Sequence, residues 1–385
     1  IALGHRRLAI VDLSPAGYQP MTSGSNRYVM TYNGEIYNSN EIRNELIKSR
    51  VTVNWRGHSD TEILLAGFDA WGIRETVSRV TGMFAIAVWD KELEQLTLIR
   101  DRIGEKPLYY GWQGSGSNKV FLFGSELKAL KKHPQFINEI DRGSLALYMR
   151  YCYVPAPHSI YKGIMKVEPG TIVTVTLQES EHTTEKYWNA LDVVRTGAES
   201  PFEGTVAEVT NNLDIALRKT IPQQMMDHVP LGAFLSGGID SSTVVALMQA
   251  QSSRPIKTFT IGFSETGYNE AEFAKLVAGH LGTEHTELYV SSQDALNVIP
   301  KLPNLYCEPF ADASQIPTFL VSSLARHHVT VSLSGDGGDE LFCGYNRYLF
   351  ADKLWKGLSM IPASVRELVG KSVKNFPAAG WNQAF

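Results

Sequence analysis

The stretch Phe234-Leu235-Ser236-Gly237-Gly238-Ile239-Asp240-Ser241-Ser242 decides the fold of the second half of this chain. The apolar residues at its start predict a strand, and the spacing after it predicts a helix that begins near Ser241. A glycine- and serine-rich loop therefore joins a strand to a helix. Backbone N–H groups in such a loop, with the positive end of the helix, can surround phosphate oxygens. No lysine follows the glycines, which excludes a Walker loop.

Helical and strand patterns alternate on both sides of this loop. Strands are expected over 231–235, 256–262, 284–290 and 329–333, and helices over 206–221, 241–249, 269–281 and 315–327. Such a βαβ succession predicts a parallel, doubly wound sheet whose ligand binds at the carboxyl ends of the strands.

A second glycine-rich loop, Ser334-Gly335-Asp336-Gly337-Gly338-Asp339-Glu340, also follows a predicted strand. A loop with this many carboxylates and glycines is poorly suited to a hydrophobic core and well suited to binding a metal ion and phosphate. Asp240 and Asp339 could share a Mg²⁺, since this ion is usually held by one or two carboxylates together with substrate phosphates. Either loop alone could be an ordinary turn between a strand and a helix. Their matching contexts favour a nucleotide site.

The first half of the chain is strand-rich. Strands are expected over 1–3, 28–32, 84–89, 96–100 and 171–177, with a helix over 61–71. A polar stretch over 178–204 predicts a linker. The 385 residues therefore divide into a domain over 1–177 and a second domain over 205–385.

The first half also carries a separate group of candidate site residues. Arg7 lies among apolar residues, where its guanidinium could clamp a carboxylate with two hydrogen bonds. Asn33 and Gly34 follow a predicted strand, so the side-chain amide and the backbone N–H can point at one oxyanion. Taken singly, Arg7 could form a surface ion pair, Asn33-Gly34 a hairpin turn, and Asp60 the N-cap of the next helix.

Taken together, these motifs resemble the glutamine-hydrolysing asparagine synthetases, and the first loop resembles the pyrophosphate loop of the ATP-pyrophosphatases. The resemblance covers essentially the whole chain. It implies an α/β fold of two domains. The first is an N-terminal-nucleophile αββα glutaminase sandwich, and the second is an ATP-pyrophosphatase-type doubly wound parallel sheet.

The resemblance implies a role for each candidate residue. Arg7 would bind the α-carboxylate of glutamine, while Asn33 and Gly34 would form the oxyanion hole. Glu35 and Asp60 would hold the α-ammonium group. The implied nucleotide and metal site consists of Leu235, Ser236, Gly237, Gly238, Asp240, Ser241, Ile261, Ser334 and Gly335, with Asp240 and Asp339 as the Mg²⁺ ligands.

The activity implied is the ATP-dependent amidation of aspartate, with glutamine as ammonia donor and β-aspartyl-AMP as intermediate, releasing AMP and pyrophosphate. Asp336 would help position that chemistry, and it stands where several family members carry a glutamate. A shorter carboxylate is typical of a branch that can amidate other substrates, so a sugar uronate or a natural-product precursor is an alternative acceptor. Two further alternatives are a β-lactam-synthetase-like enzyme and a fragment that binds nucleotide without catalysis.

The nucleophile of the family is an N-terminal cysteine, which we expect to lie before Ile1; we also expect a further part of the synthetase site to lie beyond Phe385. The chain is therefore interpreted as an internal fragment. None of Cys152, Cys307 and Cys343 can replace the nucleophile, because the chemistry needs the amine of its own chain terminus.

Composition limits the partners. The net charge of −4 argues against nucleic acid, and the longest apolar runs are too short to span a membrane. Three scattered cysteines indicate neither zinc nor a disulfide framework. A cytoplasmic protein that acts on glutamine, aspartate and ATP is expected, and the resemblance allows a homodimer.

Overall fold

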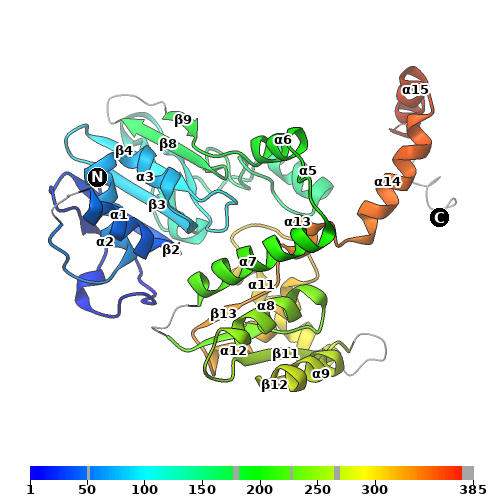
Figure 1. The fold of residues 1–385 in the computed structure, drawn as a ribbon. Coiled ribbons are helices and arrows are strands. Elements are labelled where there is room, and N and C mark those ends of the chain that lie inside the picture. The colour runs from blue at the N-terminus through cyan, green and yellow to red at the C-terminus, as the bar shows by residue number, and fades with distance from the viewer. Residues whose placement is uncertain (50–52, 177–181, 226–228, 264–268, 375–385) are drawn as a thin grey trace.

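The computed structural model describes residues 1–49, 53–176, 182–225, 229–263 and 269–374, which form two domains (Figure 1). Residues 1–9 have no regular secondary structure, so the strand expected over residues 1–3 is wrong. Ala2 instead lines a small pocket beside β2, and residues 4–8 line the cavity described below.

The first domain is built on a six-stranded antiparallel sheet in the order β1-β2-β3-β4-β8-β9. Side chains of β3 alternate between its two faces: Phe84, Ile86 and Val88 enter one apolar cluster, and Ala85 and Ala87 enter another. The strands are β1 (Met21–Thr22), β2 (Tyr28–Ile36), β3 (Gly82–Asp90), β4 (Gln95–Arg100), β8 (Thr171–Thr176) and β9 (His182–Lys186).

A layer covers each face of this sheet. Helices α1 (Ser39–Lys48), α2 (Asp60–Trp71) and α3 (Ile73–Arg79) pack on the first face. A three-stranded sheet covers the second face, and the helices α4 and α5 lie beyond it. This confirms the four-layer αββα arrangement. The elements of the outer layers are β5 (Tyr109–Gln113), β6 (Val120–Gly124), β7 (Met165–Lys166), α4 (Leu127–Leu130) and α5 (Arg142–Tyr151).

The second domain contains a four-stranded sheet in the order β12-β11-β10-β13, with every pair parallel. Ala233 and Leu235 face one helical layer, and the intervening Phe234 faces the other, so the sheet is wound on both sides as predicted. Its elements are α7 (Val206–Gln224), β10 (Leu231–Phe234), α8 (Ile239–Ala250), β11 (Lys257–Phe263), α9 (Ala271–Leu281), β12 (Glu284–Val290), α12 (Gln315–Arg326) and β13 (Val331–Leu333).

The strand order reverses between β10 and β13, because β11 and β12 lie on one side of β10 and the later β13 lies on the other. Ligands of open parallel sheets bind at such a switch point, outside the carboxyl ends of the strands. Both glycine-rich loops leave the sheet there, one after β10 and the other after β13.

The predicted linker contains regular structure. β9 pairs with β8 and α6 (Ala190–Glu199) follows it, so the first sheet continues to Lys186. The expected boundary at residue 177, the start of the linker at 178–181, and the end of the second domain at 375–385 lie outside the described residues.

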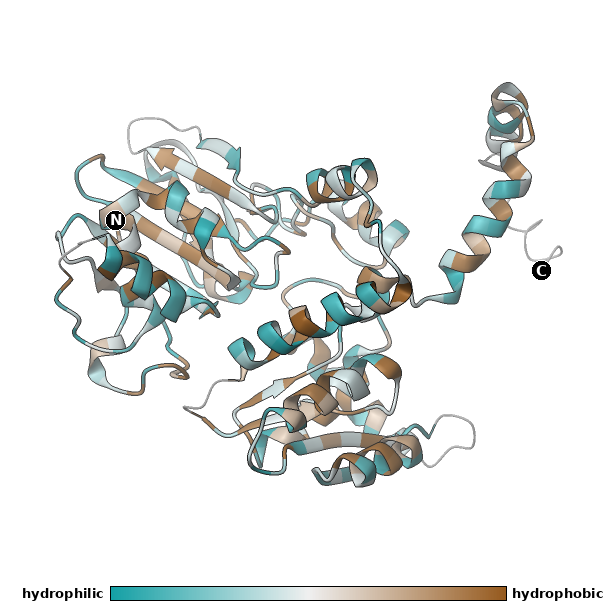
Figure 2. Cartoon of the chain, viewed as in Figure 1, coloured by the Kyte–Doolittle hydropathy of each residue, from teal (hydrophilic) through white to brown (hydrophobic). Residues whose placement is uncertain are grey.

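Three helices follow the second loop: α13 (Gly338–Phe342), α14 (Asn346–Ser359) and α15 (Ala363–Lys374). The last two project away from both sheets (Figure 1). Figure 2 shows hydrophobic residues along the strands and also on α14, where Phe350 and Trp355 are more than half exposed. None of the helices in the described part of the chain is long and apolar enough to cross a membrane.

Candidate active sites

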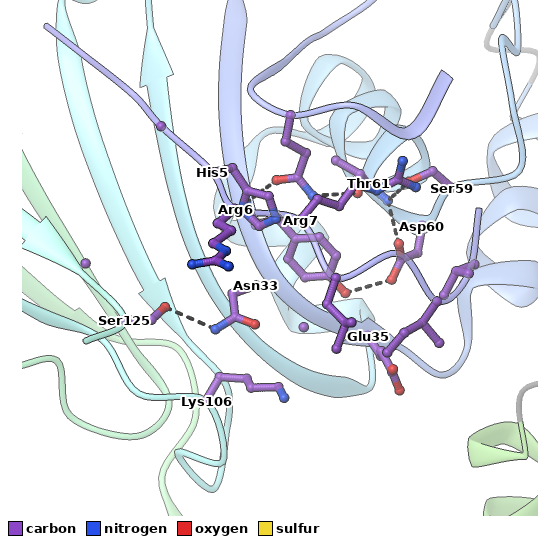
Figure 3. A pocket seen from close by; sticks show the side chains of 18 of the residues that line it. His5, Arg6, Arg7, Asn33, Glu35, Ser59, Asp60, Thr61, Lys106 and Ser125 are labelled. Carbon is purple, nitrogen blue, oxygen red and sulfur yellow. Dashed lines mark hydrogen bonds between the residues drawn. The ribbon is translucent and has the colours of Figure 1, made fainter. Parts of the chain in front are cut away.

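A cavity of about 560 Å³ opens at one edge of β2 in the first domain (Figure 3). Its walls come from the N-terminal segment, the start of α2, the chain before β5 and the chain after β6. The structure brings all five candidate glutamine residues to this one cavity: Arg7, Asn33, Gly34, Glu35 and Asp60.

Asn33 and Gly34 lie within β2, opposite Ala85 and Phe84 of β3, and not after a strand as expected. The strand continues because Gly34 permits a close approach: a β-carbon there would collide with the backbone of β3. The Asn33 amide donates a 3.1 Å hydrogen bond to the hydroxyl of Ser125.

The backbone N–H of Gly34 points to the free edge of β2. Tyr32 donates its N–H to Gln19 and Ile36 donates its N–H to Asp60, so even-numbered N–H groups of this strand face away from β3. The opposite residue, Phe84, uses both its N–H and its carbonyl toward Asp101. Gly34 therefore directs its N–H into the cavity, on the strand that also supplies the Asn33 amide.

Arg7 lines the cavity, but its guanidinium already has partners. It donates to the backbone carbonyls of Asp12 and Ser14, and a β-carbon on Gly17 would collide with it. These contacts fix the side chain against the turn at residues 12–17. The predicted clamp on a carboxylate must therefore use the donors that remain.

Asp60 is fully enclosed. Ser59 is the N-cap of α2 and Asp60 is the first helical residue, so the expected capping role belongs to its neighbour. The Asp60 carboxylate accepts hydrogen bonds from the Tyr32 hydroxyl at 2.7 Å and from the N–H of Ile36 at 3.0 Å. Burial raises its pKa, and these hydrogen bonds oppose that effect.

Glu35 is the second buried carboxyl at the cavity, and it is 6% exposed. Burial raises its pKa, the charge of Lys106 lowers it, and the charge of Asp60 raises it again. Two carboxyls beside each other and close to one lysine make a site that favours an added cation.

Lys106 and Ser125 line the cavity and were not predicted as site residues. Their signal in the sequence was weak, because a lone lysine and a lone serine are common on surfaces. The fully buried Asp101 holds the loop of Lys106 in place. Its carboxylate accepts hydrogen bonds from the N–H groups of Gly104, Glu105 and Lys106. The acidic residue after β4 thus shapes the loop that forms one wall of the cavity.

In the second domain the first loop turns tightly after β10. Gly237 has φ of +82°, and a β-carbon there would collide with the start of α9. The Ser236 and Ser241 hydroxyls lie 2.9 Å apart, and the N–H of Gly238 donates to Ser236. Helix α8 begins at Ile239, two residues before the predicted start, so it presents its first N–H groups at this loop.

The second loop packs directly on the first. A β-carbon on Gly335 would lie 2.6 Å from the backbone nitrogen of Ser241, and one on Gly338 would collide with the Asp240 carboxylate. Helix α13 begins at Gly338, and Asp339 lies in its first turn. The structure therefore brings the two loops that carry the candidate Mg²⁺ ligands into contact.

The remaining predicted residues lie around these loops. Asp336 is exposed and accepts a hydrogen bond from Ser334 at 2.9 Å. Leu235 is buried in the core, so a contact from it to a base would have to come from its backbone. Ile261 is half-buried within β11.

The fold and the two candidate sites define a chain of two domains, in which an αββα sandwich with a polar cavity precedes a parallel sheet with two glycine-rich loops. The family described as "Glutamine amidotransferase domain" matches residues 1–188, and the family described as "Asparagine synthase" matches residues 212–383. The chain belongs to the glutamine-hydrolysing asparagine synthetase family.

Three relatives illustrate the likeness. Glutamine-hydrolysing asparagine synthetase 1 of Bacillus subtilis is 36% identical over 370 residues, which cover 96% of this chain and 55% of that protein. The putative glutamine-hydrolysing asparagine synthetase 2 of Methanocaldococcus jannaschii is 36% identical over 91% of this chain and 68% of its own length. Asparagine synthetase B of Escherichia coli is 28% identical over 95% and 60%, respectively. The chain thus spans little more than half the length of the Bacillus protein.

Proposed function

We propose that the protein of which this chain forms 385 residues amidates aspartate to asparagine, with glutamine as the ammonia donor and ATP as the energy source. One observation carries the proposal. Five residues from three separate stretches of the sequence meet at one cavity in the first domain, while two glycine-rich loops meet at the switch point of the parallel sheet in the second.

In the first domain, the cavity supports the binding of glutamine by charge and shape. The free donors of Arg7 would bind the α-carboxylate. Glu35 would accept the α-ammonium group, and the enclosed Asp60 would add its charge from behind. The Gly34 N–H and the Asn33 amide would stabilise the oxyanion that forms when the side-chain amide is attacked.

In the second domain, the loop from Ser236 to Ser241 would hold the phosphates of ATP, with Ser334 and Gly335 on the opposite side. The carboxylates of Asp240 and Asp339 are the donor type that Mg²⁺ prefers, and they would hold this ion. When bound, Mg²⁺ neutralises part of the charge on the phosphates.

The reaction would begin with an attack of the aspartate β-carboxylate on the α-phosphorus of ATP, which forms β-aspartyl-AMP and releases pyrophosphate. Ammonia from glutamine would then displace AMP and give asparagine, with Asp336 positioned to assist. Enclosure of the intermediate would protect it from water. We place this activity in the cytoplasm and propose a homodimer, which light scattering would test.

The decisive experiment is ATP–pyrophosphate exchange by the full gene product, with aspartate and with a panel of uronates and other carboxylates. We expect exchange with aspartate. Exchange with another carboxylate and not with aspartate would show that the acceptor is different. Binding of nucleotide without any exchange would show that the protein does not catalyse the reaction.

A further inference from the structure

The segment between α11 (Leu302–Leu305) and α12 belongs to the second domain but packs against the first. We call residues 306–311 the docking segment. Cys307 packs against an apolar cluster of the first domain, and Ala311 donates its N–H to the carbonyl of Cys152 at 2.9 Å. These contacts place Glu308 between the two domains.

The Glu308 carboxylate is buried, with 9% of its side chain exposed. It accepts the N–H of Ile160 at 2.7 Å and the Tyr109 hydroxyl at 3.4 Å, and it lies 2.5 Å from the ammonium group of Lys166. All three partners belong to the first domain. A buried carboxylate is tolerated only when charge and hydrogen bonds replace water, and the first domain provides the donors and the positive charge that Glu308 needs.

The groups that bind Glu308 lie behind one wall of the glutamine cavity. Tyr109 begins β5, two residues after the cavity-lining Pro107, and it pairs with Gly124 of β6, which also lines the cavity. In α4, Ala129 lines the cavity, while Leu127 and Leu130 belong to the cluster that receives Cys307. The same short elements therefore carry the cavity on one side and the docking segment on the other.

A chain of contacts links Glu308 to the candidate oxyanion donor Asn33. Glu308 contacts Tyr109, Tyr109 pairs with Gly124, and Ser125 follows Gly124 in the chain. Ser125 then accepts the hydrogen bond from Asn33. A displacement of this wall would move the amide of Asn33, and small misplacements of a catalytic donor are costly.

We propose that Glu308 is a positioning residue, through which the second domain holds the wall of the glutamine cavity in its working geometry. The inference rests on the proposed glutaminase function of that cavity. Glu308 itself does not touch the cavity; it acts through Tyr109 and Lys166. Glutamine hydrolysis would then depend on the seating of the second domain.

The effect of Glu308 on the cavity wall can be measured on the 385-residue chain without an activity assay. Hydrogen exchange followed by mass spectrometry reports the amides of peptides that cover 106–127 and 158–166. We expect Glu308→Ala to speed exchange in both regions by about tenfold, because it removes the acceptor of Ile160 and the carboxylate that pairs with Lys166. Glu139→Gln is the matched control, since Glu139 forms an exposed pair with Lys162 in the same domain. Unchanged exchange in Glu308→Ala would overturn the proposal.

The functional test compares glutamine with free ammonia as the nitrogen source in the full gene product. Glu308→Ala and Lys166→Met should each raise KM for glutamine about tenfold, with the ammonia-supported rate within about twofold of the unaltered protein. The double variant should lose less than the sum of the two single losses, because both variants remove the Glu308–Lys166 ion pair. Glu308→Gln, which keeps the shape and one acceptor oxygen, should lie between the unaltered protein and Glu308→Ala.

Equal loss of the glutamine- and ammonia-supported rates, or additive losses in the double variant, would overturn the positioning role. If the unaltered protein hydrolyses no glutamine, the proposed function fails. The exchange of peptide 106–127 in Glu308→Ala then decides by itself whether Glu308 holds the wall.

Discussion

The Asn33 amide donates a 3.1 Å hydrogen bond to the Ser125 hydroxyl, and this bond joins the two sheets of the first domain at the cavity. Asn33 lies on β2 of the larger sheet, and Ser125 directly follows β6 of the smaller one. The bond leaves the amide with a fixed direction before any ligand binds, which is the condition for a preorganised oxyanion donor.

Ser125→Ala should therefore weaken glutamine hydrolysis without unfolding the protein. Loss of one hydrogen bond of about 1 kcal/mol predicts a decrease in kcat of about fivefold to tenfold. Steady-state kinetics with glutamine would measure it. Ser78→Ala, which removes an exposed hydroxyl on α3, is the control and should leave kcat unchanged. An unaltered kcat in Ser125→Ala would show that Asn33 is oriented by other contacts.

Glu35→Gln should stabilise the fold while it impairs glutamine binding. Burial raises the pKa of Glu35 in the folded state above its ordinary value, so the folded protein binds the proton more tightly than the unfolded chain does. The protonated Glu35 carboxyl therefore contributes its full share of the free energy of unfolding below the pKa that it has in the unfolded chain, about 4.3. This contribution is lost as the pH rises through the pKa of Glu35 in the folded protein.

The variant lacks this charge. Its urea midpoint should therefore exceed that of the unaltered protein at pH 8, and the difference should shrink toward pH 4. Glu199→Gln, on the exposed helix α6, should change the free energy of unfolding by less than about 0.5 kcal/mol at either pH. A constant difference across the pH range would contradict the assignment.

Gly335→Ala should damage the contact between the two glycine-rich loops of the second domain. Its β-carbon would lie 2.6 Å from the Ser241 nitrogen, and such overpacking typically costs about 1–3 kcal/mol. Urea unfolding would report the cost, and ATP–pyrophosphate exchange should fall with it. Gly357→Ala on α14 meets no atom within 4 Å and should be neutral or stabilising by up to about 1 kcal/mol. The prediction fails if the two variants are equally stable.

Asp240→Asn should separate the two halves of the reaction. We expect it to abolish pyrophosphate release, because it removes a candidate Mg²⁺ ligand at the contact of the two loops, and to leave glutamine hydrolysis measurable in the other domain. Asp192→Asn on α6, whose carboxylate is 66% exposed, is the control. Loss of both activities to the same extent would argue that the sites are not separable.

Much of the fold was predictable because its signals are local. A continuous apolar run marked β3, the polar turn after it marked β4 as its partner, and the helical spacing before Gly72 marked α2. The strand over residues 1–3 was predicted wrongly, because so short an apolar run can line a pocket as well as form a strand: Ala2 lines a small pocket beside β2. The linker was predicted too early, because β9 is a polar edge strand whose pairing with β8 is not visible in composition.

The sequence alone determined the residue types of both sites, the order of the domains and the parallel winding of the second sheet, since these follow from motifs and short-range periodicity. Only the tertiary structure decided that Gly34 turns its N–H toward the cavity, that Asp60 is enclosed, and that Asp101 shapes the loop of Lys106. It also decided that Glu308 reaches the wall of the other domain's cavity. The physical reason is the distance along the chain: a strand edge, a buried carboxylate and an ion pair between domains depend on partners that a local pattern does not contain.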